Sequence, residues 1–534
     1  MWRVLRLEQA SRPRLPISAP PPESIKLESA VFRRAHALAA VAAVAALSLA
    51  ACSGATQAPE EPSSIAIGLT SGVESLDPHA AGTVRSSTGV AGAIYSSLVA
   101  IDAEQNVLPE VAESWEQVDA TTWRFTLNPD AVFSDGETPV DADVVVWNFE
   151  RLLDADNALA VAGYLKTITG AVAVDEHTVD VTLSGPDVSI FLALAYVRFL
   201  DPAWTSSHDP NVEAFGSGPY VVEEFSPSGD IVLSANPNYW GEAPDIENVT
   251  YHVYGDASAE ANALIAGEIQ LGGDIEPRDV ERIAATDGLE TVNAASIRAA
   301  FIKLNTELDP ISDVRVRQAL NYAVDKQAII DSILLGTTEQ SQGQVLTEYF
   351  LGFDPSLEPY PFDQDRAREL LAEAGYEDGL TITIDVPSGT YVEGENITTA
   401  IGQQLAEVGV TLEQNVIPFA TYMERYTETH ELSQTAYLTQ SQMSTDRFLG
   451  LFESESVYAY WDNPTFDELV VQGRYAETEE EAAAAYEQAV AVMREEAPVL
   501  FLFPQPKVYG LSANIVWDVR DDEWILPQDI SLEQ

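Results

Sequence analysis

The chain has 534 residues, which is too long for one compact core and predicts two to four domains. Residues 52–534 carry 20 Lys and Arg against 82 Asp and Glu, a formal charge of −62. Such a surface excludes nucleic acid as a natural partner, and salt relieves its self-repulsion. Two interpretations of the acidity stay open: a protein that works in a salty medium, or an acidic secreted protein without a special demand for salt.

The N-terminal segment predicts export and attachment to a lipid. Arg33-Arg34 precede a short apolar run, residues 35–51, which ends in Leu-Ala-Ala before Cys52. A basic start, a short apolar stretch and small residues before the cleavage position are typical of a secretory signal, and the run is short for a membrane span. The ending resembles the bacterial lipobox, in which the cysteine becomes the acylated first residue, and Cys52 is the only cysteine. We expect residues 1–51 to be an upstream segment with the signal peptide and residues 52–64 to be a tether.

The first half of the mature chain alternates between strand and helix patterns. Apolar side chains occupy every second position in residues 123–127, as in a half-buried strand, and Val179, Val181 and Leu183 repeat that pattern. Asp141 precedes a run with helical spacing and is a favourable helix N-cap. We expect strands at residues 65–69, 123–127 and 179–183 and helices at residues 89–99 and 141–153.

Residues 216–241, GSGPYVVEEFSPSGDIVLSANPNYWG, have the pattern of a β-hairpin. The Gly-Ser-Gly-Pro start combines the permissive backbone of glycine with the fixed φ of proline. Two short strand-like runs, residues 220–225 and 231–235, flank a polar break. The hairpin ends in a turn that carries Tyr239 and Trp240, for which we favour a structural role.

The second half continues the same alternation. Residues 301–335 place Val316, Leu320 and Ile330 near helical spacing with polar residues between them. Glycine follows several of the helical runs, as is common at helix C-termini. We expect helices at residues 256–267, 363–374, 396–408 and 479–496 and strands at residues 380–386 and 499–503.

Several motifs in a fixed order carry a resemblance to a known family. The hairpin and the later stretches are similar to those of the bacterial extracellular solute-binding proteins, family 5, which serve dipeptide, oligopeptide and nickel ABC importers. The resemblance covers residues 65–524. The motifs that carry it are SLDP, LPEVAESW, FSDGETPVDADVVVWNFERL, the 216–241 hairpin, FIKLNT and DVRVRQALNYAVDK.

The resemblance implies an α/β fold of the two-lobed periplasmic-binding-protein type, type II-like, with a small domain inserted in the first lobe. Two crossover strands would join the lobes near residues 294–304 and 498–506. The implied boundaries are lobe I at residues 65–95, 195–295 and 503–534, the inserted subdomain at residues 96–194, and lobe II at residues 296–502.

The implied function is a substrate-binding receptor of an ABC importer, which captures a peptide-like or other small solute between the lobes and delivers it to a membrane permease driven by ATPase subunits. We expect a monomer on the outer face of the cell membrane, held there only by its N-terminal lipid. In peptide-binding members an aspartate pairs with the α-ammonium of the peptide. In this chain Ser441 stands at that position, so a solute other than a peptide stays open, and Asp446 is a possible substitute.

Family resemblance places ligand contacts after Asp77-Pro78 and in residues 419–449, and aromatic walls with a few polar groups suit a closing cleft. For the aromatic candidates, core packing is an equal alternative, and Arg85 could equally form a surface ion pair. The candidate ligand-binding residues are Thr83, Arg85, Phe419, Tyr437, Gln440, Ser441, Asp446, Tyr460 and Trp461.

The sequence offers no frame for an enzyme. It contains no phosphate-binding loop, no Gly-x-Ser-x-Gly elbow and no His-Glu-x-x-His motif, and its six histidines are scattered. We therefore expect no catalysis, no cofactor and no metal site in the protein. Two alternatives stay open: a secreted hydrolase such as a glycosidase or peptidase, and a sensory surface lipoprotein without transport.

Overall fold

The computed structural model describes residues 63–80, 85–294, 296–441 and 444–533; the side chains of residues 85, 86, 440 and 441 are not described. The predictions for Cys52 and Thr83 lie outside the described residues. Residues 62–534 group as one compact unit. Within the described residues, no helix is both long enough and apolar enough to span a membrane.

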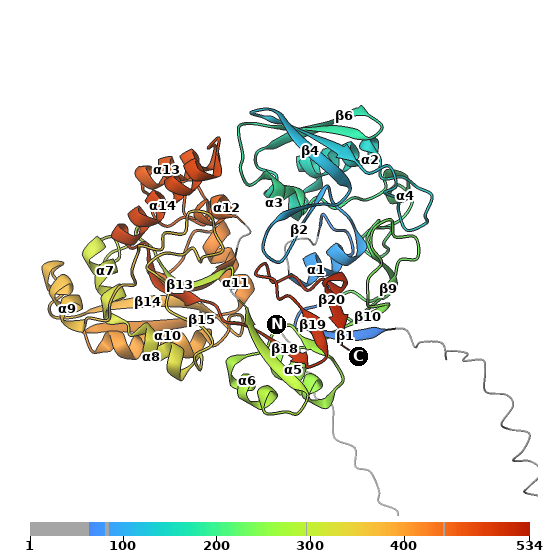
Figure 1. Cartoon of the computed structure of the whole chain (residues 1–534). Helices are drawn as coiled ribbons and strands as arrows, with labels where there is room; N and C mark the ends of the chain where they lie inside the picture. The colour runs from blue at the N-terminus through green and yellow to red at the C-terminus, as the bar shows by residue number, and fades with distance from the viewer. Residues whose placement is uncertain (1–62, 81–84, 295, 442–443, 534) are drawn as a thin grey trace, which may run out of the picture. The chain divides into compact units, whose positions relative to one another are not determined.

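A seven-stranded sheet, in the order β12-β18-β11-β1-β10-β9-β8, forms the first layer (Figure 1). Its central strand β1 is parallel to both neighbours, and the pairs beyond them are antiparallel. Helices α1 (Arg85–Ile94), α5 (Ala257–Ala266) and α6 (Pro277–Ala284) accompany it. The strands are β1 (Ser64–Leu69), β8 (Tyr220–Phe225), β9 (Ile231–Ala235), β10 (Asn248–Val253), β11 (Leu271–Gly272), β12 (Leu289–Ala294) and β18 (Lys507–Ser512).

The predicted hairpin is confirmed, because β8 and β9 have the bounds expected from the sequence and pair antiparallel. A Cβ on Gly216 would lie 2.0 Å from the Ile94 carbonyl oxygen, and a Cβ on Gly218 would lie 2.7 Å from the Ile94 carbonyl carbon. Glycine is therefore required where the hairpin meets the end of α1. The Trp240 Nε1–H donates to the Ser217 carbonyl at 3.0 Å, a structural contact at the hairpin base.

The segment between α1 and the hairpin contains a four-stranded antiparallel sheet, β4-β5-β7-β6, with α2 packed on it (Figure 1). Asp141 caps α2 by accepting from the Val144 N–H, as predicted. We call residues 96–194 the inserted segment. Its elements are β2 (Val99–Ile101), β3 (Val107–Pro109), β4 (Ala112–Asp119), β5 (Thr122–Leu127), α2 (Ala142–Leu153), β6 (Ile168–Asp175), β7 (Thr178–Leu183) and α3 (Ile190–Leu194); the short α4 (Pro202–Thr205) follows it.

A five-stranded mixed sheet, in the order β15-β14-β16-β13-β17, forms the other part. Helix α10 packs on β14 and β15, and α7 packs on β17 and α9. The helical stretch after residue 313 forms two helices. The backbone is extended at Val324, which ends the first helix, and Asp325 is the N-cap of the second. The elements are β13 (Arg298–Leu304), α7 (Val314–Ala323), α8 (Lys326–Ser332), α9 (Gln364–Glu373), β14 (Leu380–Pro387), α10 (Gly394–Ala406), β15 (Val410–Ile417), α11 (Phe419–Met423), β16 (Thr435–Ser441), α12 (Thr445–Leu449), α13 (Pro464–Arg474), α14 (Glu479–Glu496) and β17 (Val499–Pro504).

The chain passes between the two large sheets twice. β12 leads directly into β13, and β17 leads directly into β18. The sheets are therefore joined by two short connections, which is the covalent arrangement of a hinge. The domain boundaries expected from the sequence stay a prediction.

Candidate functional site

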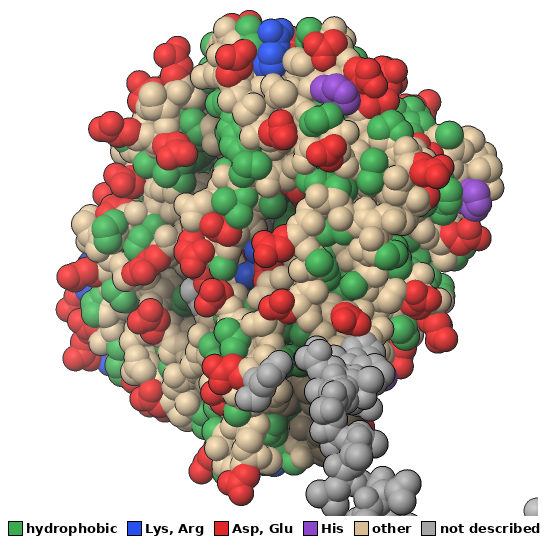
Figure 2. All heavy atoms as spheres, turned by 45° about the vertical axis from the view of Figure 1, so that its right-hand side comes forward, with side chains coloured by type: hydrophobic (Ala, Val, Ile, Leu, Met, Phe, Trp, Pro, Cys, Tyr) green, Lys and Arg blue, Asp and Glu red, His purple; other side chains and the backbone are tan. Residues whose placement is uncertain are grey.

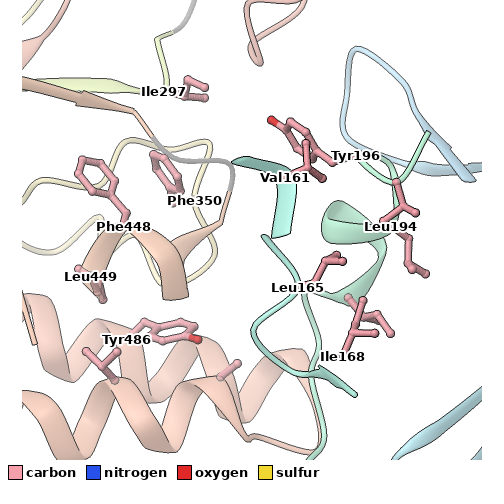
Figure 3. Packing of buried hydrophobic residues seen from close by; sticks show 14 of the residues in the cluster. Val161, Leu165, Ile168, Leu194, Tyr196, Ile297, Phe350, Phe448, Leu449 and Tyr486 are labelled. Atoms are coloured by element: carbon pink, nitrogen blue, oxygen red, sulfur yellow. The ribbon is translucent and has the colours of Figure 1, made fainter. Parts of the chain in front are cut away.

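Segments that are far apart in the sequence meet next to these two connections. One buried cluster contains residues of the inserted segment together with residues of α12 and of the start of β13. Figure 3 shows Ile297, Phe350 and Phe448 in one group and Val161 and Tyr196 in another. The inserted segment and the second sheet therefore present apolar and aromatic side chains to the same region.

An aromatic stack lines this region on the side of the inserted segment. The rings of Tyr164 and Tyr196 are parallel, with centroids 4.2 Å apart and an interplanar angle of 7°. Tyr196 meets Trp524 edge-on at 5.2 Å. The guanidinium carbons of Arg198 and Arg520 each lie 5.6 Å from the Trp524 ring. Tyr196, Trp524 and both arginines are buried in this conformation, so the stack supports the partly buried Tyr164 ring from behind.

Arg447 extends the stack from the opposite side. Its Cζ lies 3.8 Å from the centroid of the Tyr164 ring, and its Nη1 donates to the Gly163 carbonyl. Arg447 belongs to α12, whose N-cap is Ser444. Burial lowers the pKa of Arg447, but an arginine remains protonated at physiological pH. A fixed positive charge therefore borders the aromatic stack.

A second arginine lies beside Ser441, the position at which the family resemblance predicts an aspartate in peptide-binding members. In the register of β13 and β16, Arg298 is paired with Ser441. The Arg298 Nε–H donates to Glu523 Oε2 at 3.0 Å, and the Glu523 side chain is fully buried whereas that of Arg298 is 23% exposed. An arginine that is paired with a buried carboxylate and partly exposed thus lies near Ser441.

The segment before Thr83 is anchored by a buried ionic group. Arg151 of α2 binds the Asp77 carboxylate, with an Nη2–Oδ2 distance of 2.5 Å. His79 Nε2 lies 2.8 Å from the Arg198 carbonyl. Burial and the neighbouring Arg151 lower the pKa of His79 to about 4, so the ring is neutral at physiological pH. These contacts fix the chain that leads into the predicted Thr83–Arg85 region.

Three of the predicted aromatic ligand contacts lie in the core. Tyr437 is 1% exposed, and Tyr460 is fully buried with its hydroxyl donating to the Tyr426 carbonyl. Trp461 is 5% exposed and packs on Phe466. In this conformation all three have packing roles, which was the alternative left open by the sequence.

The remaining predicted residues divide into exposed, paired and undescribed side chains. Phe419 begins α11 and is 44% exposed. Asp446 is bound by Arg474 at 2.5 Å, and Arg474 also binds Glu453, so this carboxylate serves an ion-pair network. Arg85 lies in α1 and Gln440 and Ser441 lie in β16, each known by its backbone only.

Sequence reasoning did not single out the residues that the fold brings together. A signal was present, because basic residues are scarce in this acidic chain. In Figure 2 acidic side chains are spread over the visible face, whereas the few basic ones include some in a central hollow. As candidate ligand-binding residues, the few Lys and Arg close to aromatic residues could have been given priority over the abundant Asp and Glu. The residues missed are Tyr164, Tyr196, Arg298, Arg447 and Trp524.

A cavity of about 560 Å³ adjoins both connections between the sheets. It is lined by Ser296 and Gln505 of the connections, by Asn293 of β12, and by Tyr349 and Asp521 among others. The Tyr349 hydroxyl and the Gln505 Oε1 atom are buried and have no hydrogen-bond partner among the described residues. Its size is within the range of small-solute pockets. In the described part of the chain, no group of three His, Cys, Asp or Glu side chains is arranged to hold a metal ion.

Comparison with known proteins identifies the family. The family model of the bacterial extracellular solute-binding proteins, family 5 (middle region), matches residues 106–459. The chain is 29% identical over 352 residues to the glutathione-binding protein GsiB of Salmonella paratyphi A, covering 65% of this chain and 68% of that protein. It is 26% identical over 452 residues to di/tripeptide-binding protein 1 of Pseudomonas aeruginosa, covering 78% and 83%.

Solved structures show the same fold. HbpA2 from Haemophilus parasuis matches with a TM-score of 0.78 at 22% identity, over 88% of this chain and 100% of that one. NikA from Brucella suis in complex with Fe(III)-EDTA matches with a TM-score of 0.80 at 22% identity, with the same coverage. The periplasmic-binding-protein fold expected from the sequence is thereby confirmed. The chain belongs to the bacterial extracellular solute-binding proteins, family 5, and is a substrate-binding protein of ABC import and not an enzyme.

Proposed function

We propose that this receptor captures a small solute that carries a carboxylate, in the region between the Tyr164–Tyr196–Trp524 stack and the start of β13. The observation that carries the proposal is the pairing of Arg298 with Ser441 across β13 and β16. An arginine at this point can donate charge-assisted hydrogen bonds to a solute carboxylate through N–H groups other than the Nε–H that is bound to Glu523. The relatives named for peptides, glutathione and nickel show that the family accepts solutes of several kinds.

The same proposal includes the location of the receptor. The lipobox-like ending at Cys52 supports a diacylated N-terminus at the outer face of the cell membrane, with the tether leaving the folded part in water. The partners are a permease and its ATPase subunits, and the receptor acts as a monomer. Mass spectrometry of the mature N-terminus tests the anchor: Cys52→Ser is expected to remove the acyl mass, and an unmodified wild-type Cys52 would contradict it.

The solute class is tested by thermal unfolding of the mature chain in molar salt with four matched ligands. The set is one dipeptide, its N-acetyl form, its C-terminal amide and the doubly blocked form. A ligand at ~100 times its Kd adds about 2.7 kcal/mol of stability. We expect the N-acetyl form to stabilise as well as the free dipeptide and the amide to lose the effect.

Two outcomes would contradict the proposed solute class. Stabilisation by the amide but not by the N-acetyl form would show selection of a free amino terminus, with the ammonium partner elsewhere. Stabilisation by the doubly blocked form would show that the protein recognises neither the α-ammonium nor the carboxylate of the dipeptide. Arg298→Gln removes the charge at the site, and Arg366→Gln removes a charge on the distant helix α9, so the two variants are a matched pair: only Arg298→Gln should abolish the carboxylate effect.

A further inference from the structure

The contact between Arg447 and the inserted segment joins two parts of the chain that are 284 positions apart. It consists of the guanidinium on the Tyr164 ring and the hydrogen bond to the Gly163 carbonyl. Arg447 belongs to the second sheet's helix α12, whereas Gly163 and Tyr164 precede β6 of the inserted segment. The contact therefore bridges the two sides of the candidate site.

A second contact lies beside the first. A Cβ on Gly185 would lie 2.7 Å from Cδ1 of Tyr475, so the backbone at residue 185 touches that ring directly. A cavity of about 20 Å³ adjoins the contact of Arg447 with Tyr164 and is lined by both residues and by Thr167 and Ser189 among others. This is room for about one water molecule. Little space therefore remains beside the contact of Arg447 with Tyr164.

The chemistry of the contact between Arg447 and Tyr164 is suited to a contact that forms and breaks reversibly. Tyr164 and Arg447 are each only partly buried, so separating them exposes little apolar surface. A planar guanidinium on a tyrosine face is a cation–π contact that a lysine reproduces poorly. A contact of this kind is strong enough to bias a hinge equilibrium and weak enough to open.

We propose that Arg447 is a positioning residue for solute capture: it holds the inserted segment against α12 and so favours the conformation in which the two faces of the site are together. Because the binding-competent conformation is then already populated, a solute binds with less of its free energy spent on closure. The inference does not depend on which solute binds.

The test measures the distance between the two parts without any solute. The mature chain with Cys52→Ser, Val172→Cys and Val457→Cys carries two spin labels, at exposed positions of β6 and of the loop beyond α12. Pulsed electron paramagnetic resonance gives the distance distribution. We expect Arg447→Ala to add a population with a longer distance between the labels. Arg447→Lys should show a smaller fraction of that population than Arg447→Ala. Arg366→Ala on α9 is the control and should leave the distribution unchanged.

Solute affinity is the second readout. Once a ligand is known from the unfolding panel, Arg447→Ala is expected to weaken its Kd on the order of tenfold, the size of one partly desolvated cation–π contact. Tyr164→Leu should give the same distance change, and the double variant should add nothing to either single one. Tyr164→Leu also keeps the test valid if Arg447→Ala does not fold.

Two results would overturn the inference. An unchanged distance distribution with a weakened Kd would show that Arg447 contacts the solute itself. An unchanged distribution with an unchanged Kd would show that the contact has no part in capture. If no ligand of the panel stabilises the protein, only the proposed solute class is contradicted. The distance measurement still tests the role of Arg447, because it needs no solute.

Discussion

Lys303 and Arg447 each rest on an aromatic ring, in very different surroundings. Lys303 of β13 is 3% exposed, with its Nζ 4.3 Å from the Phe452 ring centroid and 3.2 Å from the Tyr426 hydroxyl. Arg447 lies on Tyr164 at the border between two parts of the chain and is only partly buried. The same type of interaction thus lies inside a core at Lys303 and at a contact that can open at Arg447.

The surroundings decide how each cation responds to pH. Burial lowers the pKa of Lys303 to about 7, so its charge is lost within the physiological range. Burial also lowers the pKa of Arg447, yet a guanidinium starts so high that it stays protonated. Stability in the core of the second sheet should therefore depend on pH, whereas the contact at the site should not.

The largest expected effect follows from removing the ring beside Lys303. Tyr426 is 1% exposed and packs with Tyr422 and Tyr460. Tyr426→Ala should destabilise the fold by about 3–5 kcal/mol, because it leaves a cavity and an uncovered cation. Denaturant unfolding in molar salt measures the change. Tyr426→Phe is the control and should cost about 1 kcal/mol for the lost hydrogen bond; a cost for alanine no larger than for phenylalanine would show that the ring is not core.

The next effect concerns the charge of Lys303. Above about pH 10 the lysine is neutral in both the folded and the unfolded chain and carries no penalty. As the pH falls, the unfolded chain binds the proton first, so the wild-type protein loses stability until the folded-state pKa of about 7 is reached, and the loss is complete below it. Lys303→Met, which cannot bind a proton, should therefore be more stable than wild type by about 2 kcal/mol at pH 6, after allowing for the unpaired Tyr426 hydroxyl.

The measurement is the free energy of unfolding of both proteins at pH 6, 8 and 10. The advantage of Lys303→Met should shrink steadily as the pH rises and vanish or reverse near pH 10. Tyr426 does not confuse the result, because burial raises its pKa well above the ordinary value. Parallel curves for the two proteins would mean that the lysine titrates normally and is not sealed in the core.

The smallest effect on stability is expected at the site. Tyr164→Leu keeps an apolar side chain at a partly buried position and loses mainly the contact with Arg447, so we expect a change below about 1 kcal/mol. The change should be the same at pH 6 and pH 8. A change in stability that differs between pH 6 and pH 8 would require a titrating group coupled to Tyr164. It would contradict the expectation that the Arg447 contact, unlike the surroundings of Lys303, is independent of pH.

The sequence determined the local elements and the family. The hairpin strands 220–225 and 231–235 and the helix 479–496 have the bounds expected from local patterns. The caps Asp141, Asp256 and Asp363 each accept a backbone N–H at the start of a helix. Such features depend on a few neighbouring residues, so turn chemistry and side-chain periodicity are enough to find them.

Tertiary structure decided which side chains form the site. Arg298 meets Ser441 only through the register of β13 with β16, and Arg447 reaches Tyr164 only because the chain folds back across 284 positions. No periodic pattern encodes such pairings, because each depends on the order of strands in a sheet and on the packing of separate layers. For the same reason Tyr437 and Tyr460 were candidate ligand contacts in the sequence but are buried in the core of the structure. Whether a residue is buried depends on the whole fold and not on its type alone.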